Sequence, residues 1–128
     1  MHQKIVNLIT QDYPNTKLIY LFGSQANGQS IKSSDWDIAI LNNEKLKPLS
    51  RWDLSESLCN LINSEVDLVD LLQASTVLQM QIVTTGKLLF DAANYADPFE
   101  MQVFSMYGHL QESRSKIIES FISEAKNA

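Results

Sequence analysis

The sequence predicts an α/β fold of the α+β kind, in which a mixed sheet of about four strands is flanked by helices. Short apolar runs, rich in β-branched and aromatic residues, alternate along the chain with longer segments of helical periodicity. The chain has 128 residues, of which 45% are hydrophobic, and a chain of this length buries about two thirds of the surface that its unfolded form exposes. We therefore expect one domain over residues 1–128, stable without disulfides or a structural metal.

Two helices are predicted in the first half of the chain. In the first, apolar residues recur at helical spacing as far as Tyr13, and Pro14 ends the segment. The second lies between Pro48 and Ser64, with Asp53 and Glu56 facing the solvent. The apolar residues predicted for the inner face of this second helix are Trp52, Leu54, Leu58, Leu61 and Ile62.

Four strands are predicted from short runs of residues that favour extended backbone. They cover residues 17–22, 36–41, 66–72 and 88–90. The first run stops at Gly23, which marks a turn.

Two further helices are predicted in the second half. Ser75 has the side chain of an N-cap for residues 76–85, and Gly86 ends that helix. Asp97 followed by Pro98 suits an N-cap and the first helical position, so the last helix is expected over residues 98–125. Its apolar residues are Phe99, Val103, Met106, Leu110, Ile117, Ile118, Phe121 and Ile122.

Residues suited to phosphate and metal binding stand at the ends of the predicted strands. Gly23 and Ser24 follow the first strand, and Asp35 and Asp37 stand at the start of the second. Side chains two apart in a strand share a face, so both carboxylates point the same way, about 7 Å apart along the chain. Trp36 then points to the opposite face, where we expect it to pack under a helix. Such paired carboxylates suit Mg²⁺, and two such ions stabilise the attacking and leaving oxygens of nucleotidyl transfer.

The third predicted strand supplies another carboxylate, which would accept the proton of an attacking hydroxyl. Asp67 and Asp70 compete for this role, and because they are three residues apart they face opposite sides of the strand. Only one of them can join the other two acids. Gly23 has no Cβ and lets backbone N–H groups approach phosphate oxygens, while Ser24 adds a hydroxyl donor.

Composition narrows the class of protein. The net charge is −5 and the pI is about 4.8, which argues against direct binding of nucleic acid, since such binding relies on Lys and Arg at phosphates. The lone Cys59 cannot form an internal disulfide and is expected to be buried in the second helix. A single unpaired cysteine fits a protein of a reducing compartment. No apolar run approaches the roughly 20 residues that cross a bilayer. We therefore expect a cytoplasmic protein without membrane contact.

The run that begins at Gly23, G-S-Q-A-N-G-Q-S-I-K-S-S-D-W-D-I-A-I, resembles the G-S-x-A-x-G-x5-S-D-x-D-h-x-h pattern (h, apolar) of the minimal nucleotidyltransferases (MNT) in the DNA polymerase β superfamily. The resemblance implies a polymerase β-like fold, ATP as nucleotide donor and Mg²⁺, two ions being expected. By position, Asp35 and Asp37 would bind metal, and Asp67 would be the third metal-binding carboxylate and the base. Gly23 and Ser24 would hold the triphosphate.

The size of the chain resembles that of MNT antitoxins in HEPN/MNT toxin–antitoxin pairs. The resemblance implies that AMP is transferred to a tyrosine of a HEPN partner, an RNase, which is thereby silenced. So short a chain leaves room for a catalytic core and one terminal helix, so the acceptor is expected to supply its own docking surface. The part of the last helix expected to contact the partner comprises Phe104, Met106, Tyr107 and Leu110.

Two alternatives stay open at this point. In one, the protein is an antitoxin that acts mainly by stoichiometric binding of the toxin. The apolar last helix is the observation that supports this alternative. In the other, the nucleotidyl group goes to RNA or to a small molecule.

Overall fold

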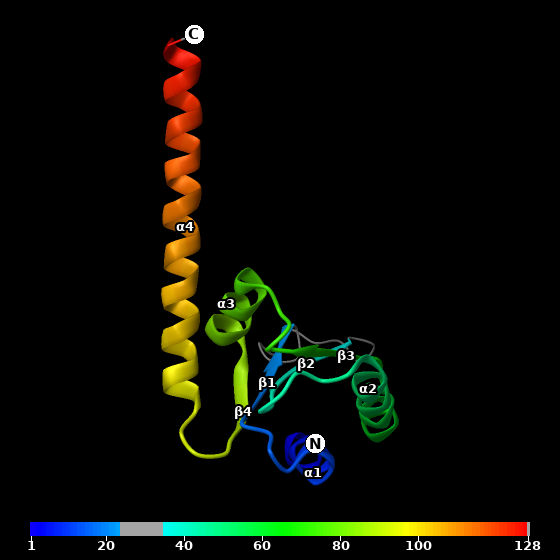
Figure 1. The fold of residues 1–128 in the computed structure, drawn as a ribbon. Coiled ribbons are helices and arrows are strands. Elements are labelled where there is room, and N and C mark those ends of the chain that lie inside the picture. The colour runs from blue at the N-terminus through cyan, green and yellow to red at the C-terminus, as the bar shows by residue number, and fades with distance from the viewer. Residues whose placement is uncertain (24–34, 128) are drawn as a thin grey trace.

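The structure, a computed structural model, describes residues 1–23 and 35–127 and is shown in Figure 1. The helices and strands follow the order that the sequence predicts. They are α1 (His2–Asp12), β1 (Leu18–Phe22), β2 (Trp36–Leu41), α2 (Pro48–Ile62), β3 (Val66–Asp70), α3 (Thr76–Thr85), β4 (Lys87–Asp91) and α4 (Ala96–Asn127). In the part of the chain described, none of the helices is both long and apolar enough to span a bilayer.

The strands form one mixed sheet in the order β3-β2-β1-β4. β1 pairs antiparallel with β2 and with β4, whereas β2 and β3 run parallel. The expected mixed sheet is confirmed, with small changes at strand ends. β3 stops at Asp70 rather than at residue 72, because the carbonyl of Asp70 accepts hydrogen bonds from the backbone N–H of Gln73 and Ala74 and so forms a turn.

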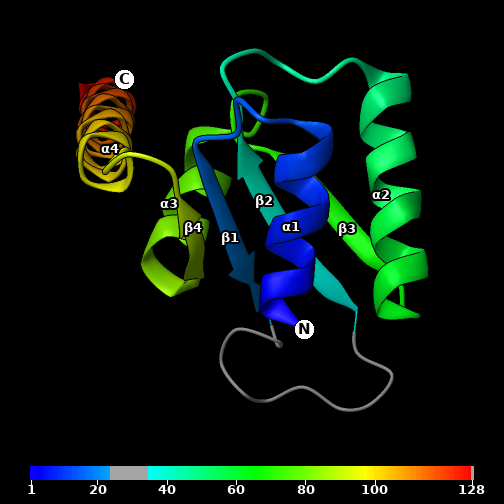
Figure 2. The same cartoon turned by 90° about the horizontal axis from the view of Figure 1, so that it is seen from below.

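Each face of the sheet carries its own apolar cluster. On one face, Ile19 and Leu21 of β1 pack with residues of α1 and α2. On the other face, Leu18, Tyr20 and Phe22 pack with residues of α3 and α4. Figure 2 shows α1 and α2 on one side of the strands and α3 with α4 on the other. The sheet is therefore the middle layer between two pairs of helices.

The packing confirms one expectation about buried side chains and corrects two others. Trp36 packs against the cluster on the α1 side, and its ring meets that of His2 edge-on with the centroids 6.3 Å apart. Trp52 is 60% exposed and does not belong to the inner face of α2, because it lies about 200° around the helix from Leu54, which is buried. Cys59 is half-buried rather than buried.

α4 begins earlier than predicted, because an acid outside the helix binds its first backbone groups. The carboxylate of Asp91, at the end of β4, accepts hydrogen bonds from the backbone N–H of Tyr95 (2.8 Å) and Ala96 (3.0 Å). Burial alone would raise the pKa of Asp91, but hydrogen bonds from Tyr95, Ala96, Ala93 and Asn94 lower it. Asp97 accordingly lies in the first turn of α4 and is not its N-cap.

α4 leaves the body of the molecule after its first turns (Figure 1). Val103 is 2% exposed where α4 packs against α3, whereas Ile117 is 69% and Phe121 73% exposed. With about 100° per residue, these three side chains lie within about 40° of one another around the helix. The apolar stripe that joins α4 to the core therefore continues, uncovered, along the projecting part.

Candidate active site

The predicted acidic residues meet where β1 ends and β2 and β3 begin. Phe22 of β1 pairs with Asp37 of β2, and Asp37 pairs in turn with Asp67 of β3. Residues paired in register point to the same face of a sheet, as do residues two apart in one strand. Asp35, just before β2, thus lies next to the other two acids. The expected grouping of three carboxylates on one face is what this register produces.

Gly23 stands against this group on the side of β1. Its φ is +73°, a conformation that L side chains rarely adopt, and a Cβ at this position would collide with Oδ2 of Asp37. Glycine is required here for both reasons. Gly23 therefore lies next to the acids, as the sequence predicted. The prediction for Ser24 concerns a position outside the described residues.

The electrostatics of the group centre on Asp37. Asp35 and Asp67 are exposed, while Asp37 is half-buried. Burial raises the pKa of Asp37 above its ordinary value, and the negative charges of Asp67 and Asp35 raise it further. Carboxylates that repel one another at a partly exposed position favour the arrival of a cation.

The donor set fits a hard divalent cation, since Mg²⁺ prefers carboxylate oxygens and keeps several of its waters. Within residues 1–23 and 35–127, no three His, Cys, Asp or Glu side chains form a ready-made metal cage. The fit therefore rests on the chemistry of the oxygen donors and on the mutual repulsion at Asp37.

The structure separates the two acids of β3 that the sequence left in competition. Asp70 is 2% exposed and faces the other side of the strand from Asp67. Its Oδ2 accepts hydrogen bonds from the backbone N–H of Leu46 (2.7 Å) and from Nε2 of Gln73 (3.3 Å), and its Oδ1 accepts one from the backbone N–H of Leu72 (3.0 Å). Asp70 thus anchors the chain around β3 and lies apart from the group formed with Asp67.

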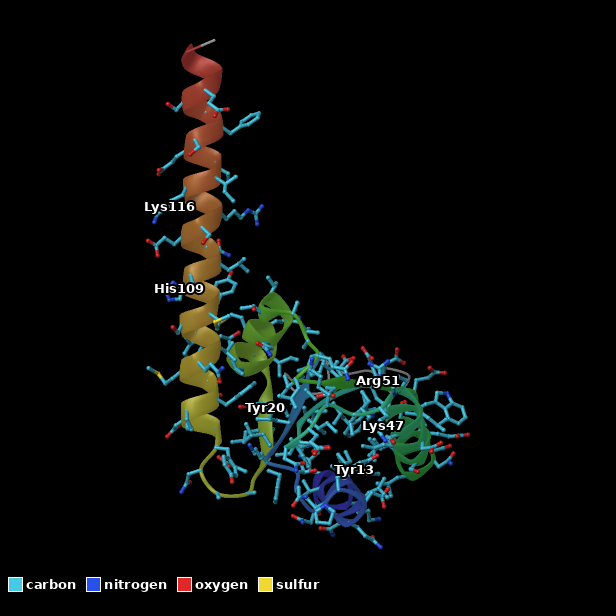
Figure 3. The ribbon with its side chains drawn as sticks, viewed as in Figure 1. Tyr13, Tyr20, Lys47, Arg51, His109 and Lys116 are labelled. Atoms are coloured by element: carbon cyan, nitrogen blue, oxygen red, sulfur yellow. The ribbon has the colours of Figure 1, made fainter. Side chains whose placement is uncertain are left out.

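Sequence reasoning missed a small pocket next to the acids. It has a volume of about 220 Å³ and lies between α2 and β3, with Asp67 among its lining residues. Arg51 and Trp52 of α2 contribute to it, and Figure 3 shows Arg51 where α2 passes β3. Neither residue stands out in the sequence, because only the packing of α2 against β3 brings them near Asp67. A larger pocket of about 460 Å³, between the sheet, α3 and α4, contains none of the three acids.

Comparison with known families agrees with this geometry. Residues 3–95 match the family described as polymerase beta, nucleotidyltransferase. The match covers all of the strands described above and every acid of the group. This chain belongs to that nucleotidyltransferase family. The expectation of a polymerase β-like fold is thereby confirmed.

The nucleotidyltransferase also resembles individual proteins over nearly its whole length. The protein adenylyltransferase MntA of Shewanella oneidensis is 42% identical over 120 residues, which are 94% of this chain and 86% of that protein. A protein of the same name from Aphanizomenon flos-aquae is 28% identical, over 85% of this chain and 82% of that protein.

Solved structures of toxin–antitoxin complexes also contain chains similar to this one. A crystal structure of a toxin–antitoxin with AMP-PNP contains a chain that is 42% identical, with a TM-score of 0.86, over 94% of this chain and 98% of that chain. A structure of tri-AMPylated Shewanella oneidensis HEPN toxin in complex with MNT antitoxin contains a chain that is 40% identical, with a TM-score of 0.78, over 94% of this chain and 95% of that one. About 94% of this chain thus has a counterpart in structures of toxin–antitoxin complexes.

Proposed function

We propose that this nucleotidyltransferase is a protein adenylyltransferase that moves AMP from ATP to a tyrosine hydroxyl of a HEPN-type RNase toxin and so neutralises it. The observation that carries the proposal is the group of Asp35, Asp37 and Asp67 beside Gly23. Its support from outside the chain is the 42% identity to a protein adenylyltransferase and the AMPylated HEPN toxin in a related complex.

Asp35, Asp37 and Asp67 would hold Mg²⁺, with two ions expected. Bound Mg²⁺ supplies positive charge that offsets the charge of the phosphate oxygens. Gly23 and Ser24 would hold the triphosphate. At Gly23 the missing Cβ lets the Oδ2 of Asp37, one of the carboxylates assigned to the metal, lie close to the backbone.

Asp67 acts as the general base in this proposal. It is exposed and accepts the proton of the tyrosine hydroxyl as that oxygen bonds to the α-phosphorus of ATP. The bond between the α-phosphorus and the bridging oxygen breaks, and pyrophosphate leaves with its electron pair. Since little else happens covalently, the protein contributes mainly position and charge.

α4 is the part of the chain that we assign to the toxin. Ile117 and Phe121 are 69% and 73% exposed, which is unusual for large apolar side chains unless another molecule covers them. A helical partner would bury this stripe along the projecting helix. The region that the sequence suggested for this contact, around Phe104 and Leu110, lies nearer the core, and both residues are exposed.

The same stripe supports the second candidate, an antitoxin that acts mainly by stoichiometric binding. Transfer to RNA has less support, because the net charge of −5 gives no field that attracts phosphates. We place either activity in the cytoplasm, as expected for a chain with a reduced Cys59.

The test uses the full chain with α-labelled ATP and Mg²⁺ in a lysate of its own host. The variant Asp35→Ala/Asp37→Ala is run in parallel, and Asp53→Ala, which removes an exposed acid on α2, serves as the matched control. We expect one labelled protein with AMP on a tyrosine, present with the control and absent with the double variant. Label in RNA or in small molecules would overturn the proposed acceptor.

Cells that carry the toxin separate chemistry from binding. If transfer neutralises the toxin, Asp35→Ala/Asp37→Ala still forms the complex but no longer protects the cells. Full protection by the double variant at normal expression would favour the stoichiometric antitoxin instead.

A further inference from the structure

The acids of the site lie on the same face of the sheet as α3 and the first turns of α4. Residues an even number apart in a strand share a face, so Asp37 faces the same side as Ala39 and Leu41. Ala39 and Leu41 pack in the apolar cluster that contains residues of α3 and α4. Asp67 is paired with Asp37 and shares this face. We call it the acid-bearing face.

α4 meets the acid-bearing face at the end of β2 that is far from the acids. Val103 and Met106 of α4 line the pocket of about 460 Å³ together with Leu41. Since a strand advances about 3.3 Å per residue, Leu41 lies about 13 Å along β2 from Asp37. This pocket therefore fills the corner between α4 and the sheet, and we call it the corner pocket.

From this corner, α4 rises away from the sheet on the side of the acids. Figure 1 shows α4 extending far beyond α3, on the side of the sheet opposite to α1, and Figure 2 shows the helix nearly end-on beside the strands. At about 1.5 Å per residue, α4 rises about 27 Å from Val103 to Phe121. The projecting part of α4 therefore stands beside the space that lies over the acid-bearing face.

The apolar stripe of α4 faces this space. At about 100° per residue, Ile117 and Phe121 point within the sector between Met106 and Val103, both of which line the corner pocket. Lys116 lies about 140° around the helix from Phe121, and Figure 3 shows it on the side of α4 away from the sheet. The apolar surface thus continues from the corner pocket along the side of α4 that looks over the acids.

Charge and size limit the kind of molecule that this surface can hold. The chain carries a net charge of −5, and Asp35 and Asp67 are exposed, so a second copy of the chain would be repelled and a partner of opposite charge attracted. A folded domain of about 100 residues has a radius of gyration of about 13 Å. Such a domain can contact the stripe and the acids at once, whereas a peptide of a few residues cannot.

We infer that the apolar stripe of α4 and the acid-bearing face form two walls of one docking site for the folded acceptor protein, and that the length of α4 determines which tyrosine of the acceptor reaches Asp67. The inference rests on the proposed function and adds to it how the acceptor is positioned. The stripe holds the acceptor, and the sheet meets its tyrosine. The hydroxyl of that tyrosine gives its proton to Asp67 as its oxygen bonds to the α-phosphorus and pyrophosphate leaves.

The experiment lengthens α4 without altering its surface pattern. In the lengthened chain, residues 110–116 are duplicated in tandem. Seven residues advance a helix by about 10.5 Å and turn it to within about 20° of two full turns, so Ile117 and Phe121 move away from the sheet but keep their direction. The control chain carries the same seven residues appended after the last residue, where they leave the stripe in place.

Affinity and transfer are measured with the acceptor protein recovered by labelling. We expect the lengthened chain to bind the acceptor with a Kd within about tenfold of that of the unchanged chain, because the stripe is kept. At saturating acceptor, its transfer of AMP to the usual tyrosine should fall by at least about 100-fold, because the hydroxyl no longer reaches the acids. The control chain should match the unchanged chain, and the Kd for ATP should be the same in all three.

Transfer by the lengthened chain at the unchanged rate would show that α4 does not set the position of the acceptor, and loss of the complex would show that the stripe does not hold it. Either result overturns the inference, while transfer by the unchanged chain upholds the proposed function. If the unchanged chain transfers AMP to no protein, both fail. A purified chain that is a dimer, and that Phe121→Lys converts to a monomer, would assign the stripe to a second copy and also overturn the inference.

Discussion

Gly23 lies directly against the carboxylate of Asp37 across the antiparallel pair of β1 and β2, so closely that a Cβ on residue 23 would collide with Oδ2. The chain therefore turns at the end of β1 with its backbone next to the half-buried acid of the site. Both the φ of +73° and the lack of space exclude other residues.

Gly23→Ala should be damaging to both stability and activity. The left-handed conformation costs a residue with a Cβ about 1–2 kcal/mol, and the added methyl group displaces the carboxylate of Asp37. We expect the free energy of unfolding to fall by about that amount in urea denaturation, and AMP transfer to fall by at least about 100-fold. Transfer at an unchanged rate would show that the contact between Gly23 and Asp37 is unimportant.

Asp37→Asn should stabilise the protein at neutral pH. Because folding raises the pKa of Asp37, the folded state binds this proton more tightly, and stability falls as the pH rises from about the unfolded pKa to the folded one. Above the folded pKa, Asp37 is ionised in both states, and the folded state bears the full unfavourable free energy of holding that charge. We expect the variant to gain about 1–3 °C in Tm at pH 7 and to lose this gain toward the ordinary pKa of 3.8.

Thermal melts between pH 3.5 and pH 7 measure this effect, and added Mg²⁺ provides a second readout. Mg²⁺ should raise the Tm of the unchanged chain more than that of Asp37→Asn. The unchanged chain has three acids whose mutual repulsion the ion relieves, whereas the variant has only two. A variant with a lower Tm than the unchanged chain at pH 7 would contradict the prediction.

The two acids of β3 should respond in opposite ways to replacement by alanine. Asp70→Ala leaves the backbone N–H groups of Leu46 and Leu72 without their acceptor, and should lower the free energy of unfolding by about 2–4 kcal/mol. Asp67→Ala, at an exposed position, should change it by less than about 0.5 kcal/mol and reduce transfer by at least about 100-fold. Urea denaturation and the transfer assay are carried out on both variants. A loss of stability in Asp67→Ala together with a loss of transfer only in Asp70→Ala would refute these roles of the two acids.

The apolar stripe of α4 should matter for the partner and not for the fold. Ile117→Lys/Phe121→Lys places charges at side chains that are 69% and 73% exposed, so the Tm should stay the same, while the affinity for the acceptor should fall by at least about tenfold. The control is Glu112→Ala, which removes an exposed ion pair with Lys116 on the opposite face of α4. A complex as strong as that of the unchanged chain would assign the partner to another surface.

Much of this protein follows from local patterns in its sequence. The order of helices and strands, the turn at Gly23 and the common face of Asp35 and Asp37 depend on periodicity and on residue preferences within a few positions. The same local run carried the resemblance to nucleotidyltransferases, which the match over residues 3–95 confirms. These features need no knowledge of which segments lie side by side.

Other features were decided only by tertiary packing. The parallel register of β2 and β3 placed Asp67 beside Asp37 and left Asp70 to bind the chain at Leu46. Contact of α2 with β3 brought Arg51 and Trp52 into the lining of a pocket that Asp67 also lines. Asp91, at the end of β4, moved the start of α4. Each of these depends on contacts between segments far apart in the chain, and the free energy of such contacts is absent from any short stretch of sequence.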